Sequence, residues 1–260
     1  MNPTRLLVLL PAWFVFAATP AFAQTSPASN PQFNSWITST SRSYARVWQD
    51  AAARTSNTTS ITWPTAGTNN GGQTRPAYTD IARVLYSDTY VYVYTTGLPS
   101  WTMGPWPTNF PNWPADRNGL HRFPRTPTIP TVKSNTMGPG VDINAVAVNG
   151  LGLFNCLDAQ SYSATSRTVG FNGDRIWQRT APAGEADTMD RNNAHQQNTG
   201  TYHSHHNPLG IRQLLGDHVI LDPATGKYRE STAAVTAHSP LLAWGRAGKG
   251  RSGWKGSGCG

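Results

Sequence analysis

Glycine and proline recur so closely along this chain that long uninterrupted helices have little room to form. The sequence holds 24 Gly and 20 Pro among 260 residues, and charged residues make up only 13%. Ten Trp are present as well. Frequent turn-forming residues combined with many aromatics are typical of a β-rich extracellular domain rather than a helical bundle. We therefore expect a mainly β fold, an antiparallel sandwich or barrel-like arrangement, with a few short helices.

The first 23 residues have the features of a secretory signal peptide. Arg5 supplies the positive start, residues 6–18 form an apolar run, and residues 21–23 read Ala-Phe-Ala, a small-x-small cleavage pattern. We expect cleavage before Gln24 and a secreted or periplasmic location. The apolar run is too short to cross a bilayer and no later run is long enough, so no membrane span is expected.

The net charge of +8 is distributed unevenly along the chain. Four Lys and Arg and no acidic residue lie in residues 245–260, and Arg5 leaves with the signal peptide. Without these five charges the domain carries +3. A positive charge concentrated in a tail is not the basic surface that nucleic-acid binding requires. We therefore expect no nucleic-acid partner.

Three segments are expected after the signal peptide: a flexible leader at 24–34, a single β-rich domain at 35–244 and an irregular Gly/Lys-rich tail at 245–260. Within the domain, Tyr and Val alternate over residues 90–94, which predicts a strand with one aromatic and one aliphatic face. Residues 141–147 also alternate. Asn149-Gly150 then predicts a tight turn into a second strand at 151–154.

Cys156 and Cys259 are the two cysteines of the chain. An oxidising compartment would allow them to form a disulfide bond, although Cys259 lies in the Gly-rich tail, where ordered pairing is hard to expect. We keep both states as possibilities. Neither cysteine belongs to a CxxC pattern, so a thiol redox site is not indicated.

Residues 101–114, "WTMGPWPTNFPNWP", combine four Pro with Trp101, Trp106 and Trp113. Proline at this density excludes a regular helix or a central strand. The three indole rings could form an exposed platform that stacks on a sugar or a polymer. The simpler interpretation, which we favour, is a long loop whose rings hold it against the core.

Histidines concentrate between residues 195 and 218. In an extended segment His203 and His205 point to the same face, close enough to share a metal ion. Tyr202 and Ser204 then lie on the opposite face. A third ligand must come from elsewhere, and His195, His238 and His218 are the candidates. A His-x-His pair is a weak motif on its own, because buried histidines often only complete a polar hydrogen-bond network.

A short helix is expected over residues 208–215, with Asn207 as its cap and Pro208 at its first position. The N-terminus of this helix would lie beside the imidazoles and would favour an anionic ligand there. Residues 217–231 resemble a hairpin with its turn at 222–226. "HSPLLAW" at 238–244 is expected to be a short apolar strand.

Three stretches of the chain resemble the YHYH-domain family of exported bacterial proteins. They are "VDINAVAVNGLGLFNCLDAQSYS" at 141–163, "NAHQQNTGTYHSHHNPLGIRQLLGDHV" at 193–219 and "HSPLLAW" at 238–244. The resemblance covers about residues 80–244. It implies a fold and a site that includes the two histidines of the motif, but it does not imply a particular reaction.

Two departures from the family pattern stand out. Ser204 occupies the third position of the motif, Tyr202-His203-Ser204-His205, where the family has Tyr. After Trp244 the chain runs into "GRAGKGRSGWKGSGCG" in place of the aromatic and Pro-containing stretches of the family. This end is expected to reflect a truncated or frameshifted reading frame, or a divergent terminus.

Three functions fit these residues. The first is a metal-dependent hydrolase with a divalent ion, zinc or copper, held by His203, His205 and either His238 or His195. Tyr202 or His218 would move a proton. The substrate would be a small molecule or a polymer, either neutral or anionic. Neither HExxH nor GxSxG occurs, so the common zinc-protease helix and the α/β-hydrolase elbow are absent. The second function is a non-catalytic binding module for a surface polymer or glycan. The third is a scaffold with structural histidines.

Overall fold

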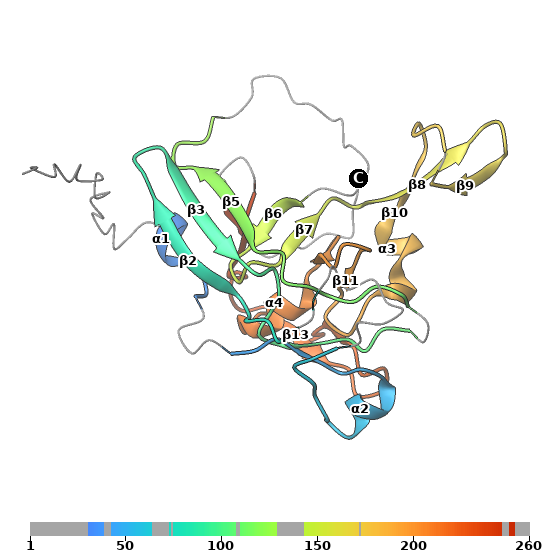
Figure 1. Ribbon diagram of the computed structural model, residues 1–260, viewed down its shortest axis with the longest axis horizontal. Helices are drawn as coiled ribbons and strands as arrows, with labels where there is room; N and C mark the ends of the chain where they lie inside the picture. Colours follow the sequence, from blue (N-terminus) through green and yellow to red (C-terminus); the bar gives the residue numbers. More distant parts are fainter. Residues whose placement is uncertain are drawn as a thin grey trace, which may run out of the picture.

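The computed structural model describes residues 31–38, 43–63, 73, 75–107, 110–128, 143–171, 173–245 and 250–252. Most elements in these ranges are short strands in antiparallel pairs, as the composition predicts (Figure 1). The helices are short: α1 (Pro31–Asn34), α2 (Ala51–Thr55), α3 (Ala181–Gly184), the 3-10 turn η1 (Ala186–Thr188) and α4 (Leu209–Leu214). None of the described helices is long and apolar enough to cross a membrane. The expected signal peptide lies outside the described residues.

The largest sheet has six strands in the order β11-β12-β7-β6-β15-β16. Their bounds are His195–Gln196, Tyr202–Ser204, Gly152–Phe154, Ile143–Ala147, Leu241–Gly245 and Gly250–Ser252. β6 and β7 form the predicted hairpin, and Gly150 at its turn has φ +91°. An added Cβ at Gly150 would come within 2.0 Å of the Thr95 hydroxyl oxygen, so the turn requires glycine. β12 joins β7 in parallel, and this pairing brings the histidine segment into the sheet.

A second sheet has the order β2-β3-β5, with bounds Ile81–Tyr86, Tyr90–Thr95 and Gly119–Pro124. Along β3 the valines are buried and the tyrosines half-buried, which confirms the predicted two-faced strand. Val91, Val93 and Phe123 belong to the same apolar core as Val146 and Leu151 of the β6–β7 hairpin. The two sheets therefore share one core, and no closed barrel forms in the described part of the chain.

Three smaller units complete the described structure. β1 (Arg46–Val47) pairs with β4 (Thr102–Met103), and β13 (Val219–Leu221) forms a hairpin with β14 (Tyr228–Glu230), as predicted. β8 (Leu157–Ser163), β9 (Thr168–Gly170) and β10 (Gln178–Thr180) form a three-stranded arm that projects from the body (Figure 1). We refer to residues 157–180 as the arm.

Several local expectations differ from the structure. Helix α4 begins at Leu209, one residue later than predicted, and Asn207 does not cap it: Asn207 has φ +26°, and its side chain contacts Arg212 and Glu230 instead. α1 forms inside the leader that was expected to be flexible. Residues 250–252 of the tail pair with β15 rather than remaining irregular. Cys156 is disulfide-bonded, whereas Cys259 lies outside the described residues.

Candidate metal centre

Strand pairing brings three histidines together. His195 on β11 and His203 on β12 are directly opposite each other in the antiparallel register, and His205 follows β12 on the same side as His203. All three side chains are buried, and one ring nitrogen of each lies within 4.8 Å of the others. The Nε2 atoms of His203 and His205 are 3.1 Å apart. The predicted His203–His205 pair therefore gains His195 as its third member.

Hydrogen bonds at the Nδ1 atoms determine which nitrogen of each imidazole ring faces the centre of the cluster. Nδ1 of His203 lies 2.8 Å from the carbonyl oxygen of Thr201, and Nδ1 of His205 lies 2.6 Å from that of Asn155. A carbonyl oxygen can only accept, so both Nδ1 atoms donate. The Thr188 hydroxyl donates to the Glu185 carbonyl and therefore accepts from Nδ1 of His195. In neutral rings this arrangement leaves all three Nε2 atoms with lone pairs toward the centre.

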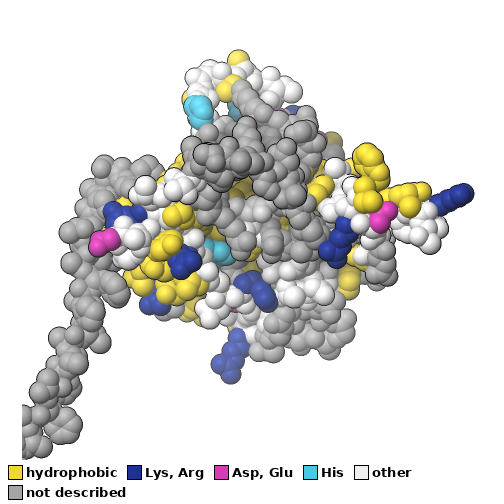
Figure 2. Space-filling model, turned by 90° about the horizontal axis from the view of Figure 1, so that it is seen from above, with side chains coloured by type: hydrophobic (Ala, Val, Ile, Leu, Met, Phe, Trp, Pro, Cys, Tyr) yellow, Lys and Arg dark blue, Asp and Glu magenta, His cyan; other side chains and the backbone are white. Residues whose placement is uncertain are grey.

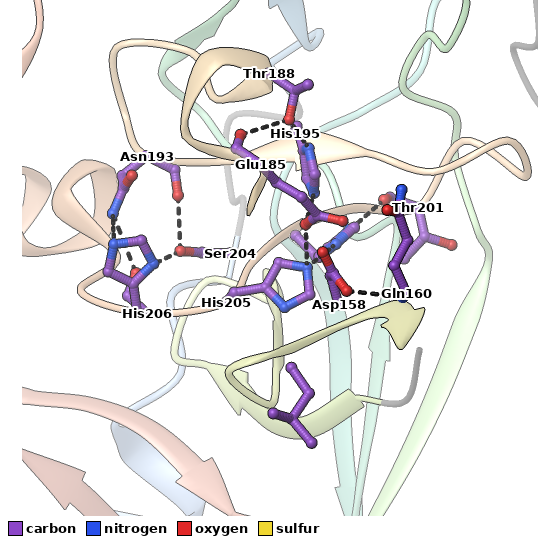
Figure 3. A network of polar contacts seen from close by, with 12 residues as sticks. Asp158, Gln160, Glu185, Thr188, Asn193, His195, Thr201, Ser204, His205 and His206 are labelled. Atoms are coloured by element: carbon purple, nitrogen blue, oxygen red, sulfur yellow. Dashed lines mark hydrogen bonds and ion pairs between the residues drawn. The ribbon is translucent and has the colours of Figure 1, made fainter. Parts of the chain in front are cut away.

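A carboxylate completes the cluster. Oε2 of Glu185 lies 3.2 Å from Nε2 of His205 and 3.4 Å from Nε2 of His195 (Figure 3). Glu185 is the residue between α3 and η1, held there by a hydrogen bond from its backbone N–H to Ala181. Sequence reasoning missed this residue because no motif links it to the histidines. The one feature of the sequence that could have drawn attention to Glu185 is the rarity of glutamate, because Glu185 and Glu230 are the only glutamates in the chain.

Burial keeps two of the imidazoles neutral. It lowers the pKa of His195 to about 4, against the opposing effect of Glu185. Burial, with His195 and His205 nearby, also holds the pKa of His203 well below its ordinary range. For Glu185, burial acts to raise the pKa, but the close approach of His205, with His195 and Arg179 also nearby, outweighs it, so the pKa is lowered. Neutral imidazoles beside an ionised carboxylate are the protonation states that metal binding requires.

Aromatic rings enclose the cluster. The Phe154 ring stacks on His203 at a centroid distance of 3.8 Å and meets His205 edge-on at 5.6 Å. Phe110 lies parallel to His195 at 6.3 Å. These apolar rings lower the local polarity and so strengthen electrostatic interactions at the centre.

A cavity of about 410 Å³ adjoins the cluster at His205. Its walls come mainly from β6, β7, β15 and the segment after β12, and they carry no Asp, Glu, Lys or Arg. The polar groups include the side chains of Asn144, Asn155 and Asn207, whereas Leu153, Phe154 and Leu242 provide apolar surface.

Tyr202, a candidate for moving protons, points away from the three histidines. It is buried, and its hydroxyl donates to Oδ2 of Asp190 at 2.7 Å while accepting from Nε1 of Trp101 at 3.3 Å. Burial and the neighbouring Asp190 carboxylate raise the pKa of Tyr202 well above its ordinary value. The hydroxyl therefore stays protonated within a core network. Ser204, where the family motif has Tyr, is also buried and donates to the Asn193 carbonyl.

His218 and His238 are not members of the three-histidine group found among the described residues. Nε2 of His218 lies 2.6 Å from the carbonyl oxygen of Ala233. His238 is exposed, and its Nδ1 lies 2.6 Å from the carbonyl oxygen of Ser239. Of the candidate third ligands, His195 is the one that the strand register brings beside His203.

The three tryptophans proposed as a binding platform are half-buried against the core. Trp106 contacts Trp113 and Tyr202 edge-on, at centroid distances of 5.8 and 6.2 Å. Trp101 packs so closely on α4 that a Cβ at Gly210 would come within 2.8 Å of its ring. These contacts match the simpler interpretation, in which the rings hold the loop in place.

Comparison with known proteins gives one match. Residues 121–248 match the family model described as YHYH protein, and this range contains Glu185 and all three clustered histidines. No curated protein and no solved structure matches the chain.

Proposed function

Residues 121–248 form a YHYH domain, and from this premise we propose that the chain binds a divalent transition-metal ion through His195, His203 and His205. One observation carries the proposal: each ring is held at Nδ1 by an acceptor, and the three Nε2 atoms converge in a buried pocket. Fixing the outer nitrogen in this way is the usual support for a metal-bound histidine.

A purely structural role for the three histidines explains less of the geometry. With both Nδ1 atoms donating outward, the Nε2 atoms of His203 and His205 would present two lone pairs to each other at 3.1 Å. Such a contact repels unless a cation, either a proton or a metal ion, lies between the two atoms. A metal ion satisfies all three nitrogens together, whereas one proton can serve only a pair.

Imidazole ligands suit zinc, copper, iron and nickel. The cluster contains no thiolate or thioether, which would favour Cu(I). Zinc and Cu(II) are therefore the ions that we propose first.

For the reaction, we propose metal-dependent hydrolysis in an exported protein. A bound ion would lower the pKa of a coordinated water and polarise a carbonyl or phosphoryl oxygen of the substrate. The cavity beside His205 gives a small molecule, or one unit of a polymer, a place to bind next to the ion. The uncharged lining of this cavity supports a neutral substrate.

Metal analysis of the purified chain tests the proposal. We expect a stoichiometric transition metal in the wild-type chain, its loss in His203→Ala and its retention in His238→Ala, which removes an exposed histidine. Absence of bound metal after incubation with Zn²⁺ or Cu²⁺, or metal retained in His203→Ala, would contradict the metal site. A panel of ester, phosphate and glycoside substrates, tested with and without the ion, then examines the hydrolase activity.

A further inference from the structure

We propose that Glu185 is the fourth ligand of the ion, so that the centre has three imidazoles and one carboxylate. The inference rests on the proposed metal function and adds a residue that lies outside the histidine signature. It starts from the position of Oε2, which is buried and makes no well-formed hydrogen bond. That oxygen nevertheless lies within 3.4 Å of two of the converging nitrogens.

Three of the six donor–donor distances match the edges of a tetrahedral coordination site. Ligand atoms about 2.0–2.1 Å from a zinc ion in tetrahedral geometry lie about 3.3 Å from one another. Three such edges are present: 3.1 Å between Nε2 of His203 and Nε2 of His205, 3.2 Å from His205 to Glu185, and 3.4 Å from His195 to Glu185. The carboxylate oxygen therefore lies at ligand-to-ligand distance from two of the three nitrogens, beside the three-histidine group.

Charge balance favours the same assignment. Three neutral imidazoles around a divalent ion would leave two positive charges in a pocket walled by Phe154 and Phe110, and an uncompensated buried charge is strongly unfavourable. One carboxylate halves that charge. The nearby Arg179 ion-pairs with Asp158, so it already has a carboxylate partner of its own.

The position of Glu185 is tied to that of His195 through one side chain. The Thr188 hydroxyl donates to the Glu185 carbonyl at 2.6 Å and accepts from Nδ1 of His195 at 2.8 Å. A single threonine thus orients one ligand ring and the backbone of the proposed carboxylate ligand. Such preorganisation is expected of residues that act on the same ion.

A fourth protein ligand has a chemical consequence. Zinc with four protein donors is coordinatively complete, so a reactive water binds only if zinc expands to five ligands or the carboxylate moves aside. Glu185 would then control whether the ion is closed or open to the cavity beside His205.

Cobalt substitution of the full chain tests the role of Glu185. After chelation, Co²⁺ is added to the wild type, Glu185→Gln, Glu185→Asp, His203→Ala and the control Asp187→Asn, an exposed acid two residues away. The measurements are the visible Co²⁺ spectrum and the dissociation constant from chelator competition, with circular dichroism to verify folding. We expect the dissociation constant to rise at least about tenfold in Glu185→Gln, with a changed spectrum. Glu185→Asp should recover part of the affinity, and Asp187→Asn should match the wild type.

Two results would overturn the inference, and they separate it from the proposed function. If Glu185→Gln binds Co²⁺ with wild-type affinity and spectrum while His203→Ala loses it, the histidines form the site and Glu185 is not a ligand. If the wild type does not bind Co²⁺, the metal function fails together with the inference. Should Glu185→Gln fail to fold, an unchanged spectrum in Glu185→Asp would equally count against the carboxylate as a ligand.

Discussion

His195 and His203 are register partners on the antiparallel strands β11 and β12, with their rings 4.7 Å apart. This pairing brings a residue from outside the Tyr-His-Ser-His segment to the face where His203 and His205 already lie. The site is therefore a product of strand pairing, and the two-residue spacing between His203 and His205 supplies only part of it.

Thr188→Val should weaken metal binding without unfolding the chain. The substitution keeps the branched shape but removes the hydroxyl that accepts from Nδ1 of His195. Loss of such a supporting hydrogen bond reduces metal affinity by about 10- to 100-fold. Competition with a chelator measures the change, and Thr199→Val provides a matched control on an exposed turn. Equal affinities for the two variants would show that Thr188 does not support the site.

Tyr202→Phe should reduce stability and leave metal content unchanged. The substitution removes one donor from the buried Asp190 carboxylate and the acceptor of the Trp101 indole N–H. Leaving buried polar groups without partners costs about 1–3 kcal/mol. Urea denaturation measures the free energy of unfolding, with Tyr92→Phe on the half-buried face of β3 as the control. If hydrolysis is lost while stability is retained, Tyr202 acts in the reaction instead.

Asp80 should make the fold less stable as the pH rises. Burial raises the pKa of Asp80 from 3.8 to about 6, despite hydrogen bonds that oppose the shift. Because the folded-state pKa lies above the unfolded value, the stabilising contribution is complete below about pH 4 and is lost as the pH rises through 6. The shift corresponds to a loss of about 3 kcal/mol.

Asp80→Asn should remove this dependence. Asp80 has φ +64°, a conformation that Asn also tolerates, so the backbone need not change. The free energy of unfolding of the wild type and the variant is compared between pH 4 and 8, with the exposed Asp88→Asn as the control. Parallel pH profiles for wild type and Asp80→Asn would refute the assignment.

The arm should tolerate loss of its exposed apolar side chains. Phe171, Ile176 and Trp177 are 71%, 75% and 75% exposed, and Figure 2 shows apolar side chains gathered on this projection. Replacing all three with Ser should change the free energy of unfolding by less than about 0.5 kcal/mol per site, while reducing self-association. Analytical ultracentrifugation at rising concentration measures the association. Ile220→Ser, a substitution of an exposed residue on β13, is the control for self-association. A large drop in the stability of the triple variant would mean that the arm packs against the body.

Local patterns predicted much of the fold. The alternation over residues 90–94 depends only on the two-residue period of a strand, and the Asn149-Gly150 turn depends on a backbone conformation that glycine permits. Both features depend only on residues that are adjacent in the sequence, so the sequence alone predicts them. The start of α4 was misplaced because the Asn207 side chain contacts Arg212 and Glu230, tertiary partners that no local rule includes.

The site was predicted in part for the same reason. The proximity of His203 and His205 was predicted from the two-residue period of an extended chain, and it holds although His205 lies in the bend after β12. His195 was one of several candidates, because the choice depends on which strands pair. Glu185 could not be found from spacing, since it reaches the histidines from the turn between α3 and η1. A rare residue type in the chain was its sole local signal.

The place of β11 in the sheet has a kinetic consequence. β11 is two residues long and lies at the end of the six-stranded sheet, and among the described strands only β12 pairs with it. Short edge strands open locally at a lower free energy than the centre of a sheet. Hydrogen exchange of the backbone amides of β11 should therefore follow local opening of this strand rather than global unfolding. An ion bound by both β11 and β12 would slow exchange at this edge of the sheet more than at its centre.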